Sequence, residues 1–361
     1  MKKNSVLLFC SSMILMVSLA CARPSFGDIK IKGKTVQELK DGDTIYFSNG
    51  ELDGKYFDER LTASEIKDQE FELTLKLSYP HMFKTNLKSE KGRIVLRGGE
   101  YFIDRSTSTI TLDSIGECSF VSGRTQKEFK ERFVPFMMKP DLYDCKESSL
   151  GILRYFNGQE HDQKLVKYIE EYPDSFVALW FLIERIETEG HTQSYQKALQ
   201  LFSKDMKREK LWQMAQETLE SICIKENDPF PVLQVKDTSL TLVGLQLPKA
   251  RYTLVDYWFN NCRPCLEAFP KIQQLYGKYH AKGFEVIGIS VDRTEHIGKW
   301  KQRIKDEGLK WPQYLDENGI KTKKDRITVF PTTFLLNEKG EVVKKNIPLE
   351  KLEKLLKNNM H

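Results

Sequence analysis

The segment VDYWFNNCRPC, residues 255–265, decides the fold of the C-terminal part of the chain. It starts within a mostly apolar run and ends in two cysteines, Cys262 and Cys265, that are separated by an arginine and a proline. Two cysteines at this spacing occur in redox-active dithiols, in zinc sites and in structural disulfides. The residues on either side of the segment help to separate these three possibilities.

Strands and helices are expected to alternate around this segment. A buried strand at Tyr252–Trp258 is followed by a helix at Pro264–His280. Next come a second buried strand at 284–291 and a second helix at 294–308. A hairpin at 332–345, which turns at Glu338-Lys339-Gly340, and a closing helix at 348–358 complete the pattern. A strand–helix–strand unit followed by a hairpin and a helix predicts an α/β domain with a mixed sheet.

The position of the two cysteines favours redox chemistry, although a structural disulfide between them is also geometrically feasible. A zinc site needs further ligands, and no second CXXC or closely spaced histidine pair follows Cys265. Cys262 is expected at a helix N-terminus, where free N–H groups and the helix dipole stabilise a thiolate. Arg263 adds positive charge, and Pro264 suits a first helical turn. Because the thiolate is the form that attacks disulfides, this placement predicts a reactive dithiol.

The segment closely resembles the active-site segment of thioredoxins, and the chain from about residue 227 onward resembles their exported TlpA/ResA-like branch. Two further stretches carry the resemblance. VFPTTFLLNEKGE, Val329–Glu341, resembles the second signature of that branch, and FEVIGISVD, Phe284–Asp292, resembles its central strand. The combination of the three motifs is specific, whereas a CXXC by itself is not.

The resemblance implies a role for each matching residue. Cys262 corresponds to the attacking cysteine and Cys265 to the resolving cysteine. Asp256 corresponds to a buried carboxylate, whose raised pKa lets it exchange protons with the resolving thiol. Pro331 corresponds to a cis-proline that faces the dithiol and helps to hold the client backbone. The resemblance implies neither a cofactor nor a metal ion.

Two positions depart from the pattern of the family. Asn261 stands immediately before the first cysteine, where the family usually has tryptophan, so client docking and shielding of the dithiol are expected to differ. The exported branch often has an acidic residue three positions after the second cysteine. This chain has Ala268 there and Glu267 one position earlier. One position rotates a helical side chain by about 100°, so Glu267 is not assigned the same role.

The first third of the chain has the pattern of a β domain. Several short alternating segments are separated by Gly, Asn and Asp, which mark turns. In EFELTLKLS the apolar residues Phe71, Leu73, Leu75 and Leu77 alternate with polar ones, as in a half-buried strand. Residues 26–122 are therefore expected to form a small antiparallel sandwich or barrel. Exported thioredoxins often follow a β domain of unknown function, which this stretch resembles.

A helical region is expected between the two. Its residues are rich in Lys, Glu, Gln and Leu, and one segment places five apolar residues near one helix face: Phe176, Leu179, Trp180, Ile183 and Ile186. The predicted organisation is therefore multidomain. An export signal at 1–22 precedes the N-terminal antiparallel β domain at 26–122, the central α-helical region at 123–226 and the C-terminal α/β thioredoxin-like domain at 227–361.

The N-terminus has the composition of an export signal. Lys2 and Lys3 precede an uncharged, largely apolar stretch that closes in small residues, which favours a signal over an uncleaved membrane anchor. SLAC resembles a bacterial lipobox and would make Cys21 the lipidated residue and a membrane anchor. Ala20–Ala22 would also suit ordinary signal cleavage, although the lipoprotein type is favoured. Both cleavage sites stay open.

Charge and cysteine content limit the remaining possibilities. The net charge of +5 falls to +3 without residues 1–20, and no basic stripe with interleaved aromatics occurs, so nucleic acid is not an expected partner. Beyond the targeting segment five cysteines remain, which leaves one thiol over if pairing is otherwise complete. Cys118 and Cys145 fit either a disulfide or two small buried side chains.

The resulting hypothesis is a thiol-disulfide oxidoreductase in the bacterial cell envelope, facing the periplasm. It is expected to reduce disulfide-containing client proteins and to receive electrons from an upstream thiol carrier. A peroxidase fits less well, because peroxiredoxins need Thr or Ser three positions before the reactive cysteine, where this chain has Phe259. The alternative from another class is a surface lipoprotein that binds an envelope ligand, with the thioredoxin domain as a non-catalytic scaffold.

Overall fold

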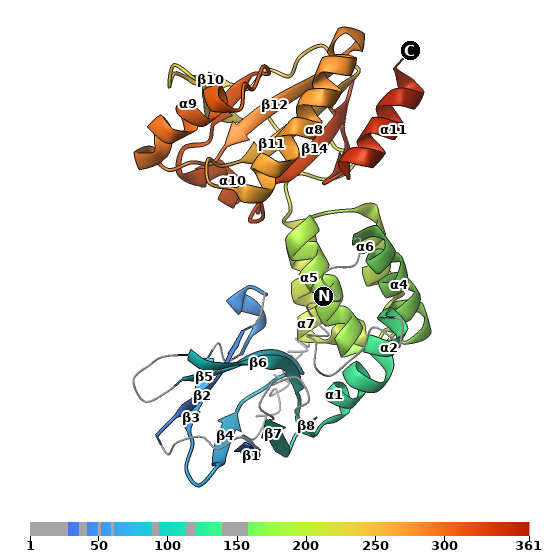
Figure 1. Cartoon of the computed structure of the whole chain (residues 1–361). Coiled ribbons are helices and arrows are strands. Elements are labelled where there is room, and N and C mark those ends of the chain that lie inside the picture. Colours follow the sequence, from blue (N-terminus) through green and yellow to red (C-terminus); the bar gives the residue numbers. More distant parts are fainter. Residues whose placement is uncertain are drawn as a thin grey trace, which may run out of the picture.

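A computed structural model describes residues 28–35, 42–49, 52–58, 61–88, 94–112, 120–138 and 158–360 (Figure 1). The predicted signal at 1–22, including Cys21, lies outside these residues, and so do Cys118 and Cys145. Within the described ranges, no helix combines the length and the apolar character needed to cross a membrane.

Eight strands form two four-stranded sheets at the N-terminal end. One sheet has the order β3-β2-β5-β6, with bounds Leu61–Glu65, Thr44–Asn49, His81–Lys88 and Ile94–Ile103. The other has the order β4-β1-β7-β8, with bounds Glu70–Leu75, Ile29–Thr35, Thr109–Leu112 and Phe120–Val121. All pairings are antiparallel except that β1 runs parallel to β7. An alternating pattern predicts which face of a strand is buried, but it does not report the direction of the neighbouring strand.

The helical part that follows is built around α5, Phe176–Glu189. The hydroxyl oxygen of Ser175 caps this helix by accepting a hydrogen bond of 2.9 Å from the Ala178 N–H. The neighbouring helices are α1, α2, α4, α6 and α7, with bounds Arg124–Glu128, Val134–Met137, Gly158–Glu171, Gln193–Leu201 and Lys210–Glu220. A π-helical turn at Phe129–Phe133 joins α1 to α2, and a short 3-10 turn at Met206–Arg208 precedes α7.

The sheets and the helices share one hydrophobic core. Trp180 of α5 makes edge-to-face contacts with Phe57 and Phe102 and a tilted contact with His81, all three from the sheet part of the chain. The buried residues of this core run from Ile29 to Ile222. The helices α5, α6 and α7 lie between the two small sheets and the C-terminal domain (Figure 1). The N-terminal sheets and the helices therefore pack as one body.

The C-terminal domain contains a mixed seven-stranded sheet of order β10-β9-β13-β12-β11-β14-β15. In sheet order the bounds are Leu242–Gly244, Gln234–Lys236, Gln313–Leu315, Phe284–Ser290, Tyr252–Trp258, Thr332–Asn337 and Val342–Lys345. β11, β12 and β13 run parallel to one another, and β14 is antiparallel to β11. The helices are α8, α9, α10 and α11, with bounds Arg263–Tyr279, Ile297–Asp306, Ile320–Lys324 and Leu349–Asn359. The predicted α/β domain with a mixed sheet is confirmed.

The central strand β11 separates two hydrophobic cores. Leu254 and Trp258 point to the side that is covered by α8 and contains both cysteines of the CXXC. Val255 and Tyr257 point to the opposite side. Because side chains alternate along a strand, Asp256 shares the face of Leu254 and Trp258.

Candidate active site

The two cysteines lie at the junction between β11 and α8. They form a disulfide with Cα atoms 5.2 Å apart, so the structure represents the oxidised state. Both are almost completely buried, with exposed fractions of 3% for Cys262 and 1% for Cys265. Cys262 is the N-cap of α8, and its Sγ accepts a hydrogen bond of 3.2 Å from the Cys265 N–H.

This cap has a direct consequence for thiol chemistry. In the reduced protein the N–H of Cys265 and the dipole of α8 would act on a Cys262 thiolate, because both already face its Sγ. Cys265 lies within the first turn and has no such open helix end. Pro264 occupies the first turn, where the missing N–H does not interrupt the helix. The geometry therefore makes the two cysteines unequal.

Arg263 is directed into solvent beside the disulfide. Its side chain is 90% exposed, and its Nε donates a hydrogen bond of 2.8 Å to Oε1 of Glu267, one helical turn further on. Solvent and this ion pair both screen the charge of the guanidinium. Glu267, which the sequence left without a role, thus lowers the positive potential next to Cys262.

Asp256 is a buried carboxyl on the dithiol side of the sheet. Its register neighbours are Gly288 on β12 and Thr333 on β14, and its exposed fraction is 1%. Within the part of the chain that the structure describes, its Oδ1 has no hydrogen-bond partner. Burial without a compensating donor raises the pKa of Asp256 to about 7. A carboxyl that titrates near neutral pH is suited to proton transfer.

The segment that carries Pro331 packs against the loop that carries the dithiol. The Phe330–Pro331 peptide bond is cis. The ring of Phe330 makes an edge-to-face contact with Phe259, at a centroid distance of 5.6 Å, and Phe259 lies three residues before Cys262. The structure therefore brings the Pro331 segment and the CXXC loop together, as the resemblance to thioredoxins predicts. The resemblance predicts that the two segments are close, but it does not predict the contact between Phe330 and Phe259.

Asp292 holds the same loop through hydrogen bonds. Its Oδ2 accepts hydrogen bonds from the Asn260 N–H at 2.9 Å and from the Ser290 hydroxyl at 2.7 Å, and its Oδ1 accepts from the side-chain amide of Asn260. All three residues are buried. Sequence reasoning placed Asp292 at the end of a strand motif and gave it no role. The available signal was a charged residue at the end of an otherwise apolar strand.

Fold and site together define a thioredoxin-like redox domain with a CXXC disulfide at a helix N-terminus. Residues 225–358 match the family described as Redoxin. Thiol-disulfide oxidoreductase ResA from Bacillus thuringiensis is 31% identical over 130 residues, which cover 35% of this chain and 74% of that protein. Sporulation thiol-disulfide oxidoreductase A from Bacillus subtilis is 31% identical over 100 residues, covering 27% and 61%.

Among solved structures, the thioredoxin domain of a thiol-disulfide oxidoreductase from Bacteroides vulgatus is 27% identical, with a TM-score of 0.34, and the match covers 38% of this chain and 98% of that domain. Through its C-terminal domain, the chain belongs to the ResA-like family of thiol-disulfide oxidoreductases. Its activity is thiol-disulfide exchange, and its partner class is disulfide-containing proteins.

Proposed function

We propose that the protein reduces disulfides of client proteins in the bacterial cell envelope, facing the periplasm. The observation that carries the proposal is the placement of Cys262 as the cap of α8, with Cys265 one turn away. Two further features favour the reducing direction. Glu267 offsets the charge of Arg263, and Asp256 brings a carboxyl to the same face of the sheet. Each of these carboxyl groups limits the stabilisation of the Cys262 thiolate. Because a reduced form that is less stabilised gives up its electrons more readily, the protein is then a stronger reductant.

The proposed reaction has two exchange steps. The Cys262 thiolate attacks one sulfur of the client disulfide, so a mixed disulfide forms while the client bond breaks and its other sulfur leaves as a thiolate. Cys265 then gives its proton to the Asp256 carboxylate and attacks Sγ of Cys262. The Cys262–Cys265 disulfide forms, and the second client thiolate leaves. Two electrons pass to the client, whose thiolates take up one proton from Asp256 and one from solvent.

Pro331 is proposed to hold the client backbone beside Cys262. This role is supported by the contact between Phe330 and Phe259, which fixes the Pro331 segment next to the CXXC loop. The hydroxyl of Thr332 donates a hydrogen bond of 2.6 Å to the carbonyl of Val329 and so orders the segment around the proline. Pro331 itself is partly exposed, as contact with a client requires.

The location and the division of the chain are also proposals. The composition of residues 1–22 supports export, and the SLAC motif supports a lipid anchor at Cys21. In this scheme residues 26–122 form the β domain, 123–226 the helical region and 227–361 the redox domain. An upstream thiol carrier returns the Cys262–Cys265 disulfide to the dithiol after each cycle.

Insulin reduction tests the function. Wild-type protein, kept reduced by dithiothreitol, should accelerate precipitation of the insulin B chain, and Cys262→Ser should abolish the acceleration. Cys265→Ser should instead accumulate a mixed disulfide with insulin, because the resolving step is lost. Equilibration with glutathione buffers then gives the direction. A wild-type protein with no effect on insulin would favour the non-catalytic scaffold.

Targeting is tested separately. Cys21→Ser should abolish incorporation of labelled lipid and release the protein from the membrane fraction. A wild-type protein that carries no lipid and begins at Arg23 would instead support cleavage after Ala20–Ala22.

A further inference from the structure

Residues 326–333 comprise most of the connection from α10 to β14 and the first two residues of β14, and they contain Pro331. The segment touches the CXXC loop through Phe330 and Phe259, so a displacement of it would move Pro331 relative to Cys262. Both ends of this segment are held by contacts that originate outside the redox domain. These contacts come from Glu187 and Glu189, at the C-terminal end of α5.

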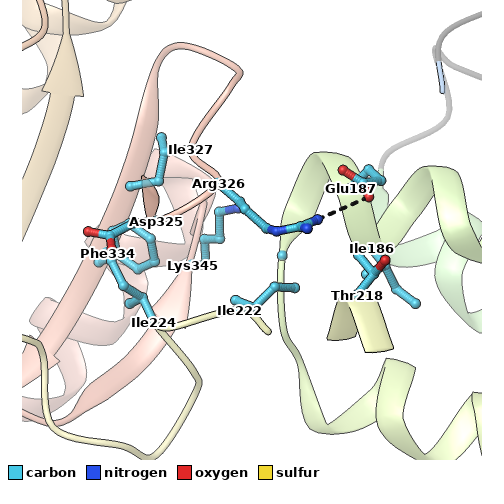
Figure 2. A pocket seen from close by; sticks show the side chains of 11 residues that line it. Ile186, Glu187, Thr218, Ile222, Ile224, Asp325, Arg326, Ile327, Phe334 and Lys345 are labelled. Carbon is cyan, nitrogen blue, oxygen red and sulfur yellow. Dashed lines mark hydrogen bonds and ion pairs between the residues drawn. The ribbon is translucent and has the colours of Figure 1, made fainter. Parts of the chain in front are cut away.

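The first contact holds the start of the segment. Nη1 of Arg326 lies 3.4 Å from Oε1 of Glu187, across the boundary between the redox domain and the helices (Figure 2). The same carboxylate oxygen accepts a hydrogen bond of 2.9 Å from the Tyr56 hydroxyl and lies 2.9 Å from Nζ of Lys55. Glu187 therefore connects the N-terminal sheets, the helices and the redox domain.

The second contact holds the end of the segment through Asn346. The Asn346 N–H donates to the carbonyl of Thr333 at 2.8 Å, and its Oδ1 accepts from the Thr333 N–H at 3.0 Å. The Nδ2 of Asn346 donates a hydrogen bond of 2.9 Å to Oε2 of Glu189. Asn346 thus relays the position of α5 to Thr333, two residues after Pro331.

Between these contacts, Nζ of Lys345 donates a hydrogen bond of 3.3 Å to the carbonyl of Thr188. Lys345 and Asn346 also line a cleft of about 490 Å³ between the helices and the redox domain. This cleft interrupts apolar packing beside Asn346, so at this place polar contacts connect the two parts.

We infer that the end of α5 positions the Pro331 segment for client docking, with Glu187 and Glu189 as positioning residues that act through Arg326 and Asn346. The inference rests on the proposed role of Pro331. The N-terminal part of the chain would then contribute to client binding, in addition to any role in linking the redox domain to a membrane anchor.

Asn346→Asp tests the inference with little other change. Asn346 has a positive φ of 48°, which aspartate also tolerates. The new side chain keeps the acceptor for the Thr333 N–H, but it turns a carboxylate oxygen towards Glu189 where an amide donated before. In the full-length protein, we expect the KM for insulin to rise about threefold to tenfold, which is the range of a typical hydrogen bond, because the lost contact acts on client binding only through Thr333. The kcat and the reaction of the reduced protein with the small disulfide dithionitrobenzoate should stay within about twofold of wild type, because the dithiol is untouched.

A rescue and a control accompany this variant. In the double variant Asn346→Asp with Glu189→Gln, the new amide can donate to the new carboxylate, so the KM should return towards the wild-type value. The control is Lys344→Ala, on β15 two positions before Asn346. It removes the 2.7 Å ion pair between Lys344 and Glu226 and leaves the contacts of Thr333 intact, so the KM for insulin should not change. If Asn346→Asp does not fold, Glu189→Ala breaks the same contact without altering the redox domain.

The outcomes separate the two claims. A wild-type protein that does not reduce insulin would refute the proposed function, and the inference with it. An active wild type, together with an unchanged KM in Asn346→Asp or no recovery in the double variant, would overturn the inference alone. A parallel fall in the rates with insulin and dithionitrobenzoate would also overturn it, since that result indicates general damage to the redox domain.

Discussion

Replacement of Asp256 by asparagine should change how the stability of the protein depends on pH. The carboxyl of Asp256 is buried beneath the dithiol, and burial raises its pKa to about 7. An aspartate in an unfolded chain has a pKa of about 3.9. The folded protein therefore keeps this proton over a pH range in which the unfolded chain has already released it. Asp256→Asn removes the titration and leaves a side chain of nearly the same size.

The sign follows from proton linkage. Below about pH 4 both states hold the proton, and Asp256 adds no pH dependence. Between about pH 4 and pH 7 the unfolded state holds fewer protons, so the free energy of unfolding falls by about 1.36 kcal/mol for each pH unit. Above about pH 7 both states are ionised and the loss is complete. Between pH 5 and pH 9, Asp256 therefore removes about 3 kcal/mol of stability from the wild type.

Denaturant unfolding of the oxidised proteins at pH 5 and pH 9 measures this quantity. The difference between variant and wild type cancels the other titrating groups, so the variant should gain about 3 kcal/mol relative to wild type on going from pH 5 to pH 9. An equal difference at both pH values would refute the raised pKa. In the reduced protein the same variant should resolve mixed disulfides more slowly, because Cys265 loses its proton acceptor.

Three further predictions concern the residues around the disulfide. In the reduced protein, iodoacetamide at neutral pH should modify Cys262 much faster than Cys265, because only Cys262 meets the open end of α8; equal rates would remove the assigned roles. Arg263→Gly should raise the pKa of Cys262 by a fraction of a unit and make the couple more reducing, and Glu267→Gln should shift both in the opposite direction. The thiolate absorbance as a function of pH gives the pKa of Cys262, and equilibration with glutathione gives the reduction potential. If neither the pKa nor the potential changes, the ion pair only affects client docking. Asp292→Ala deletes two hydrogen bonds to Asn260 of the CXXC loop and one to Ser290 at the end of β12, and it should lower the free energy of unfolding by about 2–4 kcal/mol, measured with denaturant; a loss below about 0.5 kcal/mol would contradict the structural role.

Local patterns were sufficient to predict many of the elements. The alternation of Phe71, Leu73, Leu75 and Leu77 correctly identified four buried side chains, although β4 ends at Leu75 and Leu77 lies beyond it. The three-residue strands β9, β10 and β13 were missed, because so few residues display no periodicity. The helix α5 was expected to bury one face, yet most of its side chains are buried because it lies within the shared core.

The site was predictable where its residues are close in sequence. The CXXC and its place before α8 follow from a short segment, and the proximity of Pro331 follows from the resemblance to thioredoxins. The bonds between Asp292 and Asn260 join residues 32 positions apart, and no local pattern specifies them. The contact between Glu189 and Asn346 joins two separate parts of the chain and needs the folded structure to be seen.

The shared core of sheets and helices dictates where this chain can be cut into working fragments. A recombinant fragment that begins at residue 123 would lack Phe57 and Phe102, the aromatic side chains of the sheet part that contact Trp180. It would therefore expose a large apolar surface and tend to aggregate. Ile222 is the last residue of that core, and Ile224 is the first residue of the next one. Between them lies Cys223, which is exposed and forms no disulfide with the cysteines that the structure describes. A protease site or a fluorophore introduced at this single position would therefore report on the connection between the two bodies while disturbing the interior of neither.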